Sequence, residues 1–264
     1  MLKRRILFVS LLICGCFPAV AQSAEKVTLR TGFTPNKLGE PTTISFGFSI
    51  TATGGQVPSP LTNVNLHLPA GINPATATLG DAQCETATLL LQGLEGCPPN
   101  ARVGFGKALA EVVIGPDPIR ESAQITVLNG PPENQRLVLL FYAEGITPVA
   151  AQLVFPAVIF LEPEGPFSGH IDAKVPPIAS VPGAPDVSVL DFQSTLGPRG
   201  VTYYRNVRGK TVAFHPEGIA VPTSCPRGGF RFSADYTFMD GSVVTAKSAV
   251  PCPARTRRHG SRGN

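Results

Sequence analysis

Alternation of apolar and polar side chains is the feature of this sequence that most restricts its fold. In residues 230–238 every second residue is apolar: Phe230, Phe232, Ala234, Tyr236 and Phe238. The same two-residue period recurs in residues 43–51, 63–68 and 170–175. Because successive side chains of a strand point to opposite faces, each segment predicts a strand with one buried face. Such patterns are typical of antiparallel sheets.

Turn-forming residues separate these strands. The chain contains 27 glycines and 27 prolines, dispersed along its length, and the pair at residues 240–241, Asp-Gly, predicts a tight hairpin. About a dozen short strands joined by such turns are typical of a β-sandwich. We therefore expect an all-β fold, an antiparallel β-sandwich of immunoglobulin-like or jelly-roll-like type. Residues 22–253 form this region, either as one sandwich or as two packed halves that divide near residues 115–118.

Two segments are apolar on both faces, and one segment favours a helix. Residues 137–142 predict a central strand. Residues 153–161 include Pro156, which cannot donate to a ladder, so we expect this strand to bend or to lie at an edge. The one helical turn that we expect lies within residues 85–94.

Residues 1–21 have the three parts of a secretory signal peptide. A basic segment at residues 3–5 precedes an apolar core at residues 6–17, and small side chains predict cleavage after Ala21. The apolar core is shorter than the roughly 20 residues that a membrane-spanning helix needs. We expect no transmembrane span after signal removal. The alternative is a lipid anchor at Cys16, because the four residues that end there loosely resemble a lipobox. Either way the protein is secreted or held in the cell envelope.

Basic residues are concentrated at the two ends of the chain. Of the 22 lysines and arginines, three lie in the leader and four in residues 254–264, so 15 basic residues face 18 acidic ones between them. The tail is predicted to be disordered and basic. The folded region lacks the basic excess of a nucleic-acid-binding domain, and we expect no nucleic-acid partner.

Four cysteines follow the leader: Cys84, Cys97, Cys225 and Cys252. An even number in an exported chain predicts two disulfides. Three pairings are possible, and proximity in sequence favours Cys84–Cys97 and Cys225–Cys252. A zinc site of four cysteines is disfavoured, because no Cys-x2-Cys spacing occurs.

Sequence signatures of catalysis are absent. The chain has no Gly-x-Ser-x-Gly elbow, no His-Glu-x-x-His and no P-loop. His67 and His170 fall at outward positions of alternating strands, whereas His215 follows a strand and lies in a loop. Carboxylates such as Glu162 and Asp172 are too sparse for a calcium loop. We expect no catalytic residue, no metal ion and no cofactor.

The exposed aromatic cluster predicted from the sequence is Tyr203-Tyr204-Arg205. One of two adjacent tyrosines on a strand must face outward. Together with His215, these residues form the possible binding surface. The chain has no tryptophan, and a sugar-binding platform would appear as exposed tryptophan or tyrosine.

Two groups of short motifs resemble a module of large secreted proteins from high-GC Gram-positive (actinobacterial) soil bacteria. The residues that carry the resemblance are Leu68-Pro69-Ala70-Gly71, Cys84, Cys97-Pro98, Val103-Gly104, Pro222-Thr223-Ser224-Cys225-Pro226, Phe232-Ser233-Ala234 and Cys252. They are spread over most of the chain after the leader. The resemblance implies an extracellular β-sandwich of unassigned function, and it supplies no catalytic residues.

These observations favour a secreted, non-enzymatic structural or interaction module of the cell envelope or extracellular medium. Its partner is unknown; cell-wall polymer and another surface protein are both candidates. One alternative is a secreted hydrolase, which needs a pocket where His215 meets a serine, aspartate or glutamate. The other is a carbohydrate-binding domain, which needs Tyr203 or Tyr204 flat on an open sheet face.

Overall fold

The computed structural model describes residues 25–253, apart from 75–76, 115–116, 148–150, 163 and 179–185. The predicted signal peptide at residues 1–21, the possible lipid anchor at Cys16 and the predicted tail at residues 254–264 lie outside the described residues.

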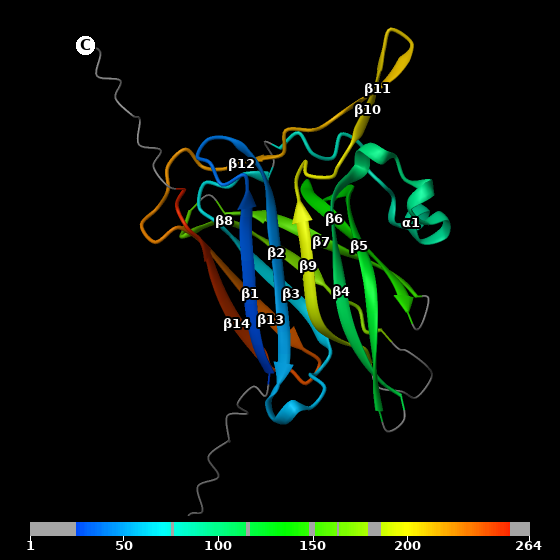
Figure 1. The fold of residues 1–264 in the computed structure, drawn as a ribbon, viewed down its shortest axis with the longest axis vertical. Helices are drawn as coiled ribbons and strands as arrows, with labels where there is room; N and C mark the ends of the chain where they lie inside the picture. The colour runs from blue at the N-terminus through cyan, green and yellow to red at the C-terminus, as the bar shows by residue number, and fades with distance from the viewer. Residues whose placement is uncertain are drawn as a thin grey trace, which may run out of the picture.

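Antiparallel strands make up most of the described chain (Figure 1). The large sheet contains β1 (Glu25–Thr34), β2 (Pro41–Ala52), β3 (Leu61–Pro69), β4 (Arg102–Ile114), β5 (Asp117–Glu133), β6 (Arg136–Thr147), β7 (Gln152–Leu161), β8 (Phe167–Lys174), β9 (Ser188–Leu196), β12 (Ile219–Ala220), β13 (Phe230–Phe238) and β14 (Val243–Val250). A separate two-stranded hairpin is formed by β10 (Tyr203–Val207) and β11 (Lys210–Phe214). The helical segments are η1 (Thr53–Gly55), α1 (Thr86–Gln92), η3 (Gly93–Gly96) and η4 (Pro99–Ala101).

The large sheet curls until its two ends meet. The strand order is β1-β2-β9-β4-β5-β6-β7-β8-β3-β13-β14, with β12 paired to β2. β1 and β14 lie side by side (Figure 1), and the Thr31 hydroxyl of β1 donates to the Ser248 hydroxyl of β14 at 3.0 Å. The sheet is therefore nearly closed and barrel-like. The all-β, antiparallel prediction is confirmed, whereas an immunoglobulin-like or jelly-roll-like sandwich is not confirmed, because these strands belong to one sheet.

The inward faces of opposite walls pack against one another. The five alternating residues of β13 are at most 2% exposed, as their period predicted. Phe48 of β2 meets Tyr236 of β13 edge to face, with ring centroids 5.0 Å apart. Burial raises the pKa of the Tyr236 phenol well above its ordinary value. A hollow of about 120 Å³ in the apolar interior enclosed by the sheet is lined in part by small side chains of β4, β5 and β6, namely Ala108, Ala123 and Ala143.

A disulfide-closed segment covers the outside of β5, β6 and β7. Both predicted disulfides are present, Cys84–Cys97 and Cys225–Cys252. The first closes the loop that carries α1, as expected for the helical turn predicted there. Leu89 of α1 is fully buried in a second apolar cluster outside the sheet. Its other buried members are Cys84, Cys97, Ala101, Leu128, Val138, Leu140 and Tyr142.

The strand order corrects the edge position expected for β7 and confirms the central position expected for β6. β7 is not an edge strand, because it pairs with both β6 and β8. Its pairing with β8 begins only at Ala157. Pro156 is therefore paired with a residue of β6 alone, Leu140. By contrast β6 is a central strand, apolar on both faces, as predicted for residues 137–142.

Candidate functional site: an open polar face

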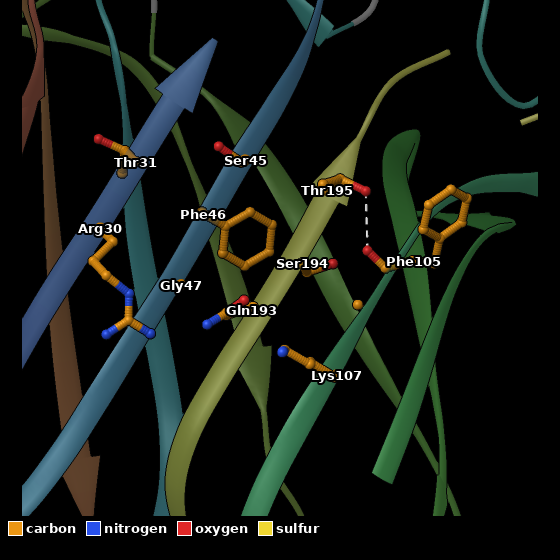
Figure 2. A pocket seen from close by; sticks show the side chains of 11 residues that line it. Arg30, Thr31, Ser45, Phe46, Gly47, Phe105, Lys107, Gln193, Ser194 and Thr195 are labelled. Atoms are coloured by element: carbon orange, nitrogen blue, oxygen red, sulfur yellow. Dashed lines mark hydrogen bonds between the residues drawn. The ribbon is translucent and has the colours of Figure 1, made fainter. Parts of the chain in front are cut away.

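The outward faces of β1, β2, β9 and β4 form a hollow of about 480 Å³ (Figure 2). The pairing register explains which side chains line it. Arg30 lies opposite Gly47, Gly47 opposite Gln193, and Gln193 opposite Lys107. The alternation of each strand sends apolar neighbours such as Phe48 and Phe192 into the core, so these polar residues face outward.

The same line of paired residues continues over three further strands. Lys107 lies opposite Gln124 of β5, which lies opposite Glu144 of β6, which in turn lies opposite Gln152 of β7. We call the seven aligned residues the polar row: Arg30, Gly47, Gln193, Lys107, Gln124, Glu144 and Gln152. Its six side chains other than that of Gly47 are exposed. At an interstrand spacing of about 4.8 Å, the polar row extends for about 29 Å along the sheet.

Asp191 orients two side chains of the polar row. Its carboxylate accepts a hydrogen bond from Nη2 of Arg30 at 2.6 Å and another from Nε2 of Gln193 at 3.3 Å. The Arg30 guanidinium also donates to the carbonyl of Phe48. Lys107 has no such partner, since no described carboxylate forms an ion pair with it. The polar row therefore offers one uncompensated cation and a set of amide donors and acceptors.

Glycines keep the backbones of this wall close together. A Cβ on Gly47 would lie 2.6 Å from the carbonyl oxygen of Phe192, and one on Gly106 would lie 1.9 Å from that of Gln193. Larger side chains cannot be accommodated at these two positions without shifting β9. At Gly47 the result is a gap in the polar row between Arg30 and Gln193, visible in Figure 2.

Hydroxyls and two phenylalanines, Phe46 and Phe105, border the hollow. Ser45 of β2 lies opposite Thr195 of β9, and the Thr195 hydroxyl donates to the carbonyl of Phe105 (Figure 2). The Phe105 ring is 40% exposed. A second hollow of about 650 Å³, over β9, β4 and β5, shares Lys107 and Gln193 with the first. The two hollows therefore adjoin along the polar row.

Of the predicted binding residues, Tyr203, Tyr204 and Arg205 belong to β10 of the protruding β10–β11 hairpin (Figure 1), and His215 directly follows β11. Tyr203 is fully buried; its hydroxyl accepts from the Gly80 amide and donates to the Arg102 carbonyl. Burial raises the pKa of this phenol. Tyr204 is 46% exposed, and Arg205 lies 5.1 Å from the centre of the Phe214 ring. Tyr203 thus anchors the hairpin, and its ring is not available at the surface.

Among the described residues, His215 forms its hydrogen-bonding contact with the backbone. Its Nδ1 lies 2.9 Å from the carbonyl oxygen of Val201. No described serine, aspartate or glutamate shares a hydrogen bond or ion pair with it. The pairing that a hydrolase centred on His215 requires is not seen among the described residues.

Sequence reasoning missed two groupings. One is the polar row, because its members come from seven strands and only the register aligns them. The other joins His67 of β3, His170 of β8 and Glu162, which follows β7. Both histidines were expected at outward strand positions, and they are there. Their direct opposition, however, depends on β3 pairing with β8, which are separated by a hundred residues.

The comparisons with known proteins identify no relative of this chain. No family model, no curated protein and no solved structure matches it. Within the part of the chain that the structure describes, no helix has the length and apolar character needed to cross a membrane. The two disulfides indicate an oxidising environment. The site therefore has to be interpreted from its own geometry.

Proposed function

We propose that this protein is a secreted, non-catalytic module of the cell envelope or extracellular medium that binds an extended polysaccharide along its polar row. The observation that carries the proposal is the alignment of outward amide and cationic side chains over adjoining hollows on an uncovered wall. Secretion is supported by the predicted leader and by the two disulfides.

The chemistry of the polar row suits a hydroxyl-rich ligand. A carboxamide donates two hydrogen bonds and accepts two, so Gln193 and Gln124 can pair with hydroxyls in either role. Ser45 and Thr195 add hydroxyls of their own beside the row. The exposed ring of Phe105 provides an apolar surface for the face of a sugar ring.

The charges favour a ligand with acidic groups at one place. Arg30 is compensated by Asp191, whereas Lys107, near the middle of the polar row, is not. Glu144, toward the far end, disfavours acidic groups there. We therefore expect the preferred ligand to be an acidic cell-wall polysaccharide with spaced rather than continuous negative charge.

Affinity gel electrophoresis of the exported protein through soluble polysaccharides tests this proposal. We expect retardation by acidic cell-wall polysaccharide and at least about tenfold weaker binding after the double substitution Lys107→Ala, Gln193→Ala, equivalent to about 1.4 kcal/mol. The matched control is Lys174→Ala, which removes an exposed lysine of β8 on the other side of the barrel. It should retain wild-type mobility.

Two results would contradict the proposal. One is wild-type retardation of the double variant with an unchanged circular dichroism spectrum. The other is the absence of retardation by every acidic and neutral polysaccharide supplied. Weakening by Lys174→Ala to the same extent would show nonspecific charge attraction, and the polar row would then not be the site.

A further inference from the structure

We propose that His67, His170 and Glu162 form a binding site for a divalent transition-metal cation of the zinc class on the outer face of β3 and β8. One potential ligand atom from each residue lies within 4.8 Å of those of the other two. Two imidazoles and a carboxylate match the donor preference of Zn²⁺, whereas Ca²⁺ and Mg²⁺ prefer oxygen donors alone. Three protein ligands leave one position of a tetrahedral ion for water.

The sheet places the two imidazoles next to each other without a loop, with their rings tilted by 52°. His67 and His170 are directly opposed residues of the β3–β8 pair, and their ring centroids are 5.6 Å apart. Glu162 reaches them from the end of β7, with its Oε1 2.5 Å from Nδ1 of His170. The ligands therefore come from elements whose relative positions are set by backbone ladders.

Aromatic neighbours restrict both rings. Phe160 of β7 stacks on His170, with centroids 4.7 Å apart and an interplanar angle of 11°. Phe167 packs against His67 at 5.0 Å. The imidazole side chains are only about one-fifth exposed, at 23% for His67 and 21% for His170. Rings held in this way lose less conformational freedom on binding a cation than freely rotating surface histidines do.

The surroundings of the two ring nitrogens of His67 supply independent support. Its Nε2 lies 3.6 Å from Oδ2 of Asp235, while its Nδ1 is buried and has no hydrogen-bond partner among the described residues. Metal-bound histidines commonly direct the second ring nitrogen to a carboxylate, which orients the ring. Asp235 is placed for that role. The buried Nδ1 then remains as the nitrogen that is free to bind the cation.

Cation binding would require a modest adjustment of the side chains. Zinc holds nitrogen and oxygen ligands at about 2.0–2.2 Å, so tetrahedral ligand atoms lie about 3.3 Å apart. The Glu162 side chain is 35% exposed, so its carboxylate has room to rotate toward that distance. Both histidines bind as neutral imidazoles, and the carboxylate binds in its ionised form.

Isothermal titration of the tag-free exported protein with ZnCl₂ alone tests the proposal, with Co²⁺ absorption in the visible region as a second measurement. We expect one Zn²⁺ per chain and a Co²⁺ spectrum typical of tetrahedral coordination. His67→Phe, which retains an aromatic ring beside Phe167, and Glu162→Gln should each weaken binding by at least about tenfold. Asp235→Asn should weaken binding less than either. The control His215→Ala removes a histidine outside the cluster.

Three results would overturn the proposal. They are a wild-type protein that binds no Zn²⁺, a His67→Phe variant that binds Zn²⁺ with wild-type affinity, and a His215→Ala variant that loses as much affinity as His67→Phe. A Zn²⁺-dependent rise in Tm that is present in the wild type and lost in Glu162→Gln gives support that does not depend on the His67→Phe variant. Because this cluster shares no residue with the polar row, its failure would leave the polysaccharide proposal untouched.

Discussion

Two parts of the same sheet differ in their outward faces: one is covered by another segment, and the other is open to solvent. Over β5, β6 and β7 the outward residues include Leu128, Leu140 and Tyr142, and the disulfide-closed segment with α1 buries them. Over β1, β2, β9 and β4 the outward residues of the polar row face solvent. The comparison shows that strand pairing does not determine whether a sheet face is covered. The outward side chains determine whether the face is covered. Burying apolar side chains away from water is favourable, whereas burying amide side chains is not.

The two faces meet on the same strands. Along β5 and β6, the outward pair Leu128 and Leu140 lies under the covering segment, and the pair Gln124 and Glu144 lies beyond it. The boundary thus falls within each strand, where the outward residues change from apolar to polar. This boundary predicts that substitutions on the two sides will affect different properties, stability on one side and binding on the other.

The largest effect on stability is expected where the covering segment packs against the sheet. Leu89→Ala removes a fully buried side chain of α1 and should lower the free energy of unfolding by about 2–5 kcal/mol. Leu91→Ala is the matched control, because Leu91 belongs to the same helix and is 84% exposed. Its effect should stay within about 0.5 kcal/mol. Urea unfolding of both variants makes the comparison, and equal midpoints would show that α1 does not stabilise the covered face.

An intermediate effect is expected where β4 and β9 of the open wall approach each other closely. Gly106→Ala places a Cβ against the carbonyl oxygen of Gln193 and should lower the free energy of unfolding by about 1–3 kcal/mol. In the control Gly32→Ala, the new Cβ meets the Ser45 hydroxyl, which can rotate away. Thermal unfolding measures both. If Gly106→Ala has the same melting temperature as Gly32→Ala and the wild type, β4 and β9 do not approach each other so closely.

The smallest effect on stability is expected in the hydrogen bonding of the open face. Asp191→Ala removes an ion pair with Arg30 whose partners are 43% and 30% exposed, and such pairs contribute about 0.2–1 kcal/mol. Chemical unfolding at low and high salt should show a small loss that salt diminishes. Polysaccharide affinity should nevertheless fall, because Arg30 and Gln193 lose the carboxylate that orients them. A stability loss as large as that of Leu89→Ala would remove the distinction between the two faces.

Several local features could be predicted from short stretches of sequence. The alternation in β2, β3, β8 and β13 identified both the strands and their buried faces, because a strand's period of two is a local property. The disulfide pairing was favoured by sequence proximity alone. The helical turn inside the first disulfide loop was also confirmed. Each of these inferences depends on residues close together along the chain.

Other features could not be predicted in this way. The proline at position 156 indicated a strand that bends or lies at an edge. β7 is not at an edge, because β8 pairs with it beyond the proline, and no local signal shows where a partner strand begins. Alternation required one of Tyr203 and Tyr204 to face outward but could not say which. Tyr203 is buried, with its hydroxyl bonded to Gly80 and Arg102, and Tyr204 is exposed. The resemblance to actinobacterial secreted modules stays a prediction.

Local sequence was enough to predict antiparallel strands with one apolar face, and proximity along the chain favoured the observed cysteine pairing. The tertiary structure was needed to show that the strands curl into one nearly closed sheet, and that residues as distant as Arg30 and Gln193, or His67 and His170, lie together. Register explains this difference. A strand's amphipathic pattern is encoded locally, whereas its partner and alignment follow from how all the apolar faces are buried at once.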